Sequence, residues 1–228
     1  MRKTSILVAG FLAGSAFGHW GYMPLKASIW PEAVSVPATT YQAARNSIFA
    51  ARRSSGDAVM IGDSITEMGD WDAIFPDYRI INRGVYSDNT AGLLVRTDEL
   101  SRVDADIAFV MIGTNDFTIR LDANGTFGRY NRIIKALAPK RVVVQSTLFR
   151  SDRYPKINEA TAELNRKLQA LCSGSVCDYL DLNATLAPNG VLLPKYSVDG
   201  THITGAAYTL WAEQIRAFLP AKPRQNSN

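Results

Sequence analysis

Short runs of consecutive apolar residues alternate along most of the chain with longer segments in which apolar residues recur every three to four positions. A short apolar run that ends in glycine, as residues 58–61 do before Gly62, is typical of a strand buried on both faces of a parallel sheet. The longer segments have the periodicity of helices that bury one side. Strands are therefore expected at residues 58–61, 78–81, 107–112, 141–146 and 176–182, and helices at residues 41–53, 90–100, 128–137, 155–171 and 206–219.

Five strands separated by helices predict a parallel sheet with helices on both faces, which is an α/β fold. No internal repeat and no change of composition interrupts residues 38–220, so we interpret this segment as one domain. The chain has 228 residues, of which 46% are hydrophobic, enough for one such domain with short appendages. Ligands of such sheets bind beyond the carboxyl ends of the strands, near the point where the strand order reverses. Candidate chemistry is expected there.

The start of the chain has the pattern of an export segment. Arg2 and Lys3 precede an uncharged, largely apolar stretch of 15 residues, 4–18, which places the start in the cytoplasm and the rest across the membrane. This length is at the upper edge for a cleaved signal peptide and below the roughly 20 residues that span a bilayer comfortably. A weak cleavage site at residues 16–18 and the interfacial aromatic residue Trp20 leave both possibilities open. Residues 1–24 are thus predicted to contact the membrane as a signal peptide or signal-anchor. The domain is predicted to be extracytoplasmic, either periplasmic or at the cell surface, and either anchored or secreted.

The two ends of the chain also carry its positive charge. Residues 25–37 contain prolines and little periodicity and are expected to form a linker, while residues 221–228 are polar and expected to form a flexible tail. The net charge is +4, but residues 1–27 hold three of the 25 basic residues and no acidic residue, and residues 221–228 hold two more. Residues 28–220 therefore carry 20 basic and 21 acidic residues. A near-neutral domain gives no support for a nucleic-acid partner, and we expect a monomer.

Polar residues follow the predicted strands at the positions where a ligand would bind. Ser64 comes directly after the first strand, where it can expose its hydroxyl as a nucleophile or cap the following helix. Thr66 stands where the G-x-S-x-G turn of the α/β-hydrolases has its second glycine, so that motif is absent. Gly84, after the second strand, permits either a close backbone approach to a ligand or a turn. Asn115, after the third strand, either donates an amide N–H to an oxyanion or forms a turn.

Asp199 and His202 form a second candidate group near the C-terminal end of the domain. Their spacing lets one turn bring the carboxylate to the imidazole Nδ1–H, which leaves Nε2 free to accept a proton. Alternatively, His202 is a surface residue near the start of a helix. The other histidine, His19, lies in the export segment, so any histidine base of the domain must be His202.

In order and content, these segments resemble the four conserved blocks of the SGNH hydrolases, also called the GDSL esterase/lipase family. The first block is similar to Gly62, Asp63, Ser64 and Ile65, the second to Gly84, the third to Gly113, Thr114, Asn115 and Asp116, and the fourth to Asp199 and His202. Val85 and Tyr86 depart from the pattern, because many relatives have small residues after the glycine of the second block.

The resemblance implies a flavodoxin-like three-layer sandwich with a five-stranded parallel sheet. It also implies ester hydrolysis through an acyl-enzyme, with no metal or organic cofactor. Ser64 would be the nucleophile, His202 its base, and Asp199 the residue that orients the imidazole. The oxyanion would be bound by the backbone N–H groups of Ser64 and Gly84 and by the side-chain amide of Asn115.

The family includes lipases, lysophospholipases, thioesterases and carbohydrate O-acetylesterases, so its motifs do not define the substrate. The connections between the predicted elements are mostly short and contain no long apolar lid, which favours a small acyl group such as acetyl on an exported glycan. One alternative is a lysophospholipase or thioesterase-like lipolytic enzyme, with an apolar acyl pocket formed by Tyr86, Phe117, Phe149, Leu192 and Leu193. At least half of these five side chains are expected to pack against the sheet instead. Another is a non-catalytic, membrane-tethered glycan-binding protein on the same scaffold, although a binder has no use for the complete set of catalytic residues.

Cys172 and Cys177 enclose four residues between a predicted helix and a predicted strand. In an oxidising compartment they can form a local disulfide, and otherwise they are free thiols. The chain has two cysteines and two histidines, which argues against a Cys/His zinc site.

Overall fold

The computed structural model of the protein describes residues 39–138 and 140–221. The predicted export segment (1–24), the linker (25–37) and residues 222–228 of the predicted tail lie outside the described residues. Within the described part, none of the helices has the length and apolar character needed to cross a membrane.

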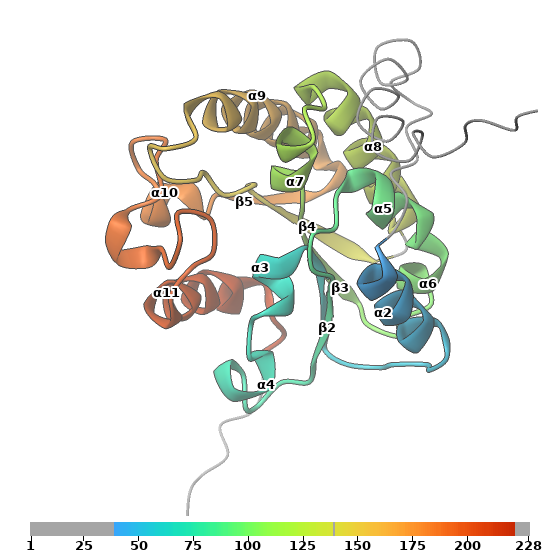
Figure 1. Ribbon diagram of the computed structural model, residues 1–228. Helices are drawn as coiled ribbons and strands as arrows, with labels where there is room; N and C mark the ends of the chain where they lie inside the picture. The colour runs from blue at the N-terminus through green and yellow to red at the C-terminus, as the bar shows by residue number, and fades with distance from the viewer. Residues whose placement is uncertain (1–38, 139, 222–228) are drawn as a thin grey trace, which may run out of the picture. The chain divides into compact units, whose positions relative to one another are not determined.

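The predicted five-stranded parallel sheet is confirmed. Its order is β2-β1-β3-β4-β5. Figure 1 shows the helices arranged around it. The strands are β1 (Ala58–Gly62), β2 (Ile80–Gly84), β3 (Ile107–Met111), β4 (Arg141–Gln145) and β5 (Asp178–Leu180). Because β1 pairs with β2 on one side and with β3 on the other, the strand order reverses between β1 and β3. The carboxyl ends of these two strands are therefore the expected ligand site.

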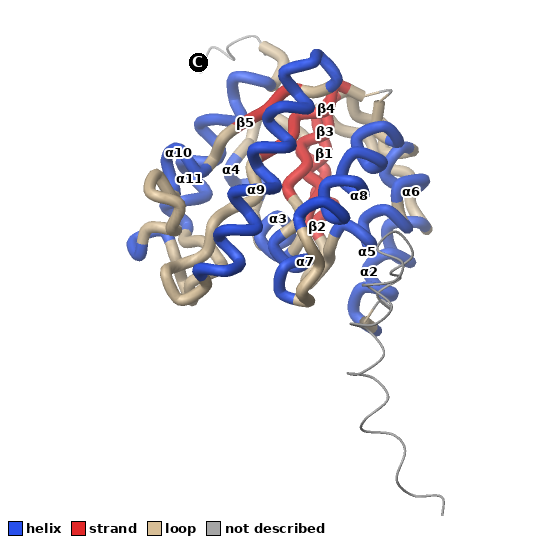
Figure 2. The backbone as a smooth tube through the Cα atoms, turned by 90° about the horizontal axis from the view of Figure 1, so that it is seen from above, coloured by secondary structure: helices blue, strands red, loops and turns tan. Residues whose placement is uncertain are grey.

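Helices cover both faces of the sheet, which makes the predicted three-layer sandwich (Figure 2). Successive strand residues point to opposite faces, so Met60 packs in one core with Trp211, while Val59 and Ile61 pack in the other with Tyr130. The first face carries α3 (Ser64–Glu67), α4 (Trp71–Ile74), α10 (Asn183–Leu186) and α11 (Gly205–Ile215), and the second carries α5 (Thr90–Val95), α6 (Thr97–Ser101), α8 (Ala123–Ala136) and α9 (Pro155–Leu171).

The remaining elements are short, apart from α2 (Thr40–Ala50). Thr39 caps α2, and its backbone N–H donates to the side chain of Gln42 in a reciprocal capping box. Phe49 is the buried residue of α2, and its ring lies against the guanidinium group of Arg83 at 4.5 Å. The others are α7 (Thr114–Thr118), η1 (Cys172–Val176), η2 (Pro194–Tyr196) and η3 (Arg216–Phe218).

Several predicted boundaries differ from those of the structure. The segment 90–100 forms two helices, α5 and α6, because the backbone of Arg96 leaves the helical conformation and its side chain turns inward to an ion pair with Asp88 (2.9 Å). Helices α3, α4, α7 and α10 have only four or five residues each, too few to show a periodicity in the sequence. Strand β5 begins at Asp178, because the π-helical turn η1 precedes it and is closed by a disulfide between Cys172 and Cys177.

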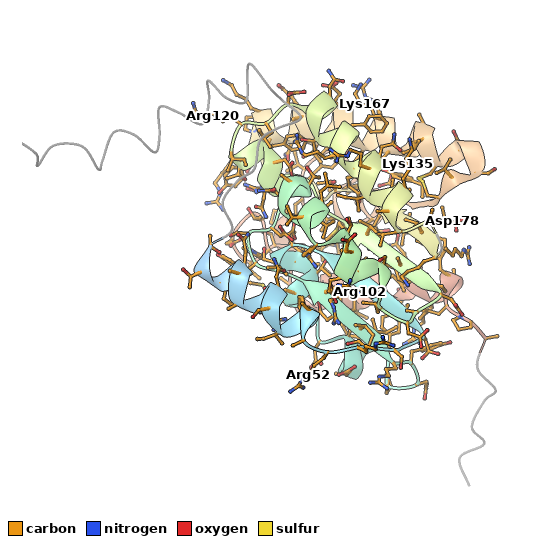
Figure 3. All side chains as sticks on the ribbon, turned by 90° about the vertical axis from the view of Figure 1, so that its right-hand side faces the viewer. Arg52, Arg102, Arg120, Lys135, Lys167 and Asp178 are labelled. Atoms are coloured by element: carbon orange, nitrogen blue, oxygen red, sulfur yellow. A yellow bond between two sulfur atoms is a disulfide. The ribbon has the colours of Figure 1, made fainter. Side chains whose placement is uncertain are left out.

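Charged side chains are distributed over the surface. On the side that Figure 3 shows, Arg52, Arg102, Arg120, Lys135 and Lys167 are well separated and point outward. Lys167 pairs with Glu163 (3.6 Å) on α9, and an exposed ion pair of this kind contributes little to stability.

Candidate active site

Ser64, His202 and Asp199 form one hydrogen-bonded chain. Ser64 is the first residue of α3, directly beyond the carboxyl end of β1, and only 7% of its surface is exposed. Its Oγ lies 3.0 Å from Nε2 of His202, and Nδ1 of His202 lies 2.7 Å from Oδ2 of Asp199. These contacts let a serine hydroxyl transfer its proton to an imidazole that a carboxylate orients. The structure thus brings the three predicted catalytic residues together.

A tight loop before α11 holds Asp199 and His202. The backbone N–H of Val198 donates to the carbonyl of His202 (2.8 Å). Gly200 has a φ of +95°, and a side chain there would meet the Ser151 hydroxyl within 2.6 Å. The carbonyl of Gly200 accepts the N–H of Ser151 (2.8 Å), so the loop that follows β4 fixes the loop that carries the imidazole.

The carboxylate of Asp199 is held in its charged form although its side chain is half exposed. Its partial burial alone would raise its pKa. The hydrogen bonds from the His202 ring and from the backbone N–H groups of His202 and Thr201 outweigh this and lower the pKa of Asp199 to about 2. Asp199 therefore stays ionised across the neutral pH range and favours the tautomer of His202 that carries its proton on Nδ1.

The turn that presents Ser64 depends on its two preceding residues. A Cβ atom at Gly62 would lie 2.4 Å from the carbonyl oxygen of Met111, so only glycine fits between β1 and β3 here. Asp63 caps α3 by accepting the N–H of Ile65 (3.0 Å). The hydroxyl of Ser64 consequently emerges at the reversal point of the sheet.

Asp63 is almost completely buried beneath the triad, with 1% of its surface exposed. Burial raises its pKa from 3.8 to about 7, and the nearby carboxylate of Asp88 adds to this, while the N–H of Ile65 and the charges of His202 and Arg150 oppose it. Asp63 is thus a buried carboxyl group next to the nucleophile, and its ionisation costs folding free energy because the charge is removed from water.

Asn115 lies in α7, beyond the carboxyl end of β3. Its Nδ2 donates one hydrogen bond to the backbone carbonyl of Asp88 (2.9 Å), and a primary amide has a second N–H to donate. The next residue, Asp116, is fully buried, accepts the N–H of Thr90 (2.9 Å) and pairs with Arg129 (3.2 Å). Asp116 therefore fixes the position of α7, while the side chain of Asn115 faces the loop after β2.

The structure contradicts the predicted role of Gly84. Its backbone N–H donates to the side-chain oxygen of Asn82 (2.9 Å) and is therefore not free for an oxyanion. A Cβ atom at Gly84 would lie 2.2 Å from the backbone nitrogen of Glu67, at the far end of α3 from Ser64. Glycine is required there for the close packing of β2 against α3.

Ser87, which the sequence did not suggest, has the geometry that was expected of Gly84. It has a φ of +58°, is exposed, and its N–H has no hydrogen-bond partner among the described residues. It immediately precedes Asp88, whose carbonyl accepts the amide of Asn115. The run Ser87, Asp88 and Asn89 has the composition of a turn, which was the only signal of this feature in the sequence.

The five residues predicted to form an acyl pocket do not lie together. Phe117 packs in the core on one face of the sheet, and Leu192 packs in the core on the other. Both side chains are buried, so they belong to the packing on the two faces of the sheet. Phe149 and Leu193 are half-buried. Tyr86 is the member that lies at the triad, where its ring is nearly parallel to that of His202, with ring centres 6.5 Å apart.

Two cavities, of about 390 and 340 Å³, lie at the opposite edge of the sheet, near Ser55 and Asp104, before the amino ends of the strands. They contain none of the triad residues. Within the described residues, no three side chains of His, Cys, Asp or Glu are grouped so that they could hold a metal ion.

The fold and the Ser–His–Asp arrangement define a hydrolase of the three-layer α/β class. Residues 60–210 match the GDSL-like Lipase/Acylhydrolase family, and the chain belongs to this family. It is a carboxylic ester hydrolase of the SGNH type. No curated protein has a sequence that matches the chain significantly.

Solved structures share the fold. A protein from Streptococcus pneumonia has a TM-score of 0.69 and 23% identity, and the match covers 79% of this chain and 91% of that chain. A GDSL-like lipase from Bacteroides thetaiotaomicron VPI-5482 has a TM-score of 0.61 and 20% identity, covering 85% of this chain and 95% of that one. The lipase/acylhydrolase from Enterococcus faecalis has a TM-score of 0.62 and 18% identity, covering 75% and 99%. At these identities the similarity shows the fold alone.

Proposed function

We propose that the protein is an exported serine esterase that removes small acyl groups, acetyl in particular, from a glycan through an acyl-enzyme. The observation that carries the catalytic assignment is the contact chain from Ser64 Oγ to His202 Nε2 (3.0 Å) and from His202 Nδ1 to Asp199 (2.7 Å). It joins the three groups that nucleophilic ester cleavage needs, in the required order.

In the acylation step, Ser64 Oγ attacks the ester carbonyl carbon and its proton passes to Nε2 of His202. The tetrahedral intermediate collapses when the carbon–oxygen bond to the alcohol breaks and His202 returns the proton to the leaving oxygen. Water then attacks the acyl-enzyme, again with His202 as base, and releases the carboxylic acid and free Ser64. Asp199 stabilises the imidazolium form of His202 in both steps.

We assign the oxyanion to the backbone N–H groups of Ser64 and Ser87 and to the second amide N–H of Asn115. The free N–H of Ser87 and its proximity to Asn115 through Asp88 support this assignment. Preorganised donors of this kind stabilise the developing negative charge without reorganisation, and each is worth about 3 to 4 kcal/mol of the barrier.

The small acyl group is supported by the burial of Phe117 and Leu192 in two separate cores, because two of the apolar side chains expected to bind a long acyl chain are occupied in packing. Export is supported by the pattern of residues 1–24 and by the disulfide Cys172–Cys177, a bond typical of oxidising compartments. A glycan is proposed as the alcohol portion of the ester because the chain begins with the pattern of an export segment.

The decisive experiment replaces Ser64 and His202 separately by alanine. Each variant should lose hydrolysis of p-nitrophenyl acetate and should retain its circular dichroism spectrum. Loss of labelling by a fluorophosphonate probe in Ser64→Ala would identify Ser64 as the nucleophile. Retained hydrolysis in either variant would refute the mechanism, and a folded wild-type protein that resists the probe would favour a non-catalytic binder.

A chain-length series of p-nitrophenyl esters tests the acyl preference. An optimum at acyl chains of eight carbons or more would exclude the preference for small acyl groups.

A further inference from the structure

Two tyrosine rings stand exposed beside the catalytic histidine. Tyr86 follows β2, is 48% exposed, and lies nearly parallel to the ring of His202 at an interplanar angle of 12°. Tyr41 comes from α2, is also 48% exposed, and meets Tyr86 edge to face with ring centres 6.3 Å apart. Large aromatic side chains are usually buried, so a pair of half-exposed rings in mutual contact at an active site indicates a binding surface.

Glu67 fixes both rings relative to the nucleophile. One of its carboxylate oxygens accepts the Tyr41 hydroxyl (2.5 Å), and the other accepts the backbone N–H of Tyr86 (2.7 Å). Glu67 is the last residue of α3, which begins at Ser64. Gln42 adds a hydrogen bond from its side-chain amide to the carbonyl of Tyr86 (3.2 Å). The two rings are therefore preorganised, which lowers the entropic cost of binding a ligand.

The chemistry of acylation decides which part of an ester these rings contact. His202 must give its proton to the leaving oxygen, so the alcohol lies on the His202 side of the carbonyl carbon. The carbonyl oxygen points instead towards the proposed oxyanion donors of Ser64, Ser87 and Asn115. Tyr86 is packed on His202, so its ring faces the alcohol portion of the ester and not the acyl portion.

The surroundings of the rings fit a sugar better than a hydrocarbon chain. A pyranose ring has C–H groups on its faces, which are attracted to the electron-rich face of an aromatic ring, and hydroxyl groups around its edge. The side chains of Gln42, Arg45 and Glu67 adjoin the tyrosines and offer amide, guanidinium and carboxylate groups to such hydroxyls. A hydrocarbon chain would displace water from these polar side chains without offering hydrogen bonds in return, at a cost in free energy.

We propose that Tyr86 and Tyr41 form a platform that binds the sugar ring whose hydroxyl carries the ester. This inference rests on the proposed esterase function and specifies the alcohol portion of the substrate. It assigns Tyr86 to the alcohol portion instead of the acyl pocket expected from the sequence.

The test compares three acetate esters that differ only in the alcohol: 6-O-acetylglucose, hexyl acetate and ethyl acetate. The release of acetic acid gives kcat/KM for each, and the ratio of the sugar ester to ethyl acetate measures recognition of the sugar. The wild-type protein should prefer 6-O-acetylglucose to both other esters. Tyr86→Leu and Tyr41→Leu should each lower the ratio about tenfold, mainly through KM, because leucine keeps apolar volume but lacks a planar ring. Tyr86→Phe should keep the ratio, because the ring remains.

Val95→Ala removes part of an exposed apolar side chain at the end of α5 and serves as a surface control, with an unchanged ratio. A preference of the wild type for hexyl acetate, or a ratio that survives in Tyr86→Leu, would overturn the platform while the esterase stands. Absence of hydrolysis of all three esters by the folded wild type would instead refute the proposed function itself.

Discussion

The buried acid beneath the nucleophile gives a quantitative prediction about stability. Asp63→Asn replaces a carboxyl group that is 1% exposed by a neutral amide of nearly the same shape. Asparagine caps helices as well as aspartate does, so the hydrogen bond from the N–H of Ile65 should persist. The substitution therefore removes the charge and leaves the turn at Ser64 intact.

The magnitude follows from the pKa of Asp63, which rises from 3.8 in the unfolded chain to about 7 in the folded protein. The folded state holds the proton more tightly, so the contribution of Asp63 to stability is complete below pH 3.8 and is lost as the pH rises through 7. Between pH 5 and pH 8 this loss amounts to about 2 to 3 kcal/mol of unfolding free energy. The amide of the Asp63→Asn variant does not titrate and has no such loss, so the stability of the variant relative to the wild type should rise by that amount over the same interval.

Urea denaturation of both proteins at half-unit steps from pH 5 to pH 8 measures this difference. Titrating groups that do not interact with Asp63 cancel in it. Asp70→Asn makes the same chemical change at the solvent-exposed cap of α4 and is the matched control. A difference between wild type and Asp63→Asn that stays constant across the pH range would refute the argument that burial controls this carboxyl group.

Further predictions concern the catalytic residues, the turn at Ser87 and the disulfide. Asp199→Asn should lower kcat about 10³- to 10⁴-fold at an unchanged fold, since the imidazole loses the partner that fixes its tautomer, and steady-state kinetics on p-nitrophenyl acetate will measure it. Asn115→Ala should lower kcat about 10²- to 10³-fold with little change in KM, and an equal effect on both constants would count against an oxyanion role. Ser87→Gly should keep kcat, because the backbone N–H remains, and should raise the unfolding free energy by up to about 1 kcal/mol, because glycine adopts the φ of +58° without strain. Replacing Cys172 and Cys177 by serine should lower the unfolding free energy by about 2 kcal/mol, and titration of the denatured, unreduced wild type should find no free thiol in this pair.

The repeated strand pattern was predictable because strands buried on both faces have no polar side and therefore read as continuous apolar runs. The core strand β3 is the clearest case, with every residue from Ile107 to Met111 buried. The contact between Asp199 and His202 was equally predictable, because three residues separate them and one turn joins them. Order in the chain also placed Ser64 and Asn115 directly after the first and third strands, which the sheet order then shows to be neighbours.

The sequence did not predict features that depend on contacts across the fold. The break between α5 and α6 follows from the ion pair of Arg96 with Asp88, which no local propensity contains. The assignment of Gly84 was wrong because its N–H is taken by Asn82, and the positive φ of Ser87 depends on how the whole loop packs. Phe117 and Leu192 were grouped by their apolar character, but a sheet has two faces and only the packing decides which face each residue covers.

The sequence by itself thus determined the α/β class, the family and the identity of the groups that can perform ester chemistry, because periodicity and short motifs are local. The tertiary structure decided which backbone N–H groups are free at the site and that the ring of Tyr86 lies beside that of His202. Ser64 and His202 are 138 positions apart, and their 3.0 Å contact exists only because the sheet and the loop before α11 converge at one edge. Distances of this kind are set by the packing of the core, and packing is a property of the folded chain as a whole.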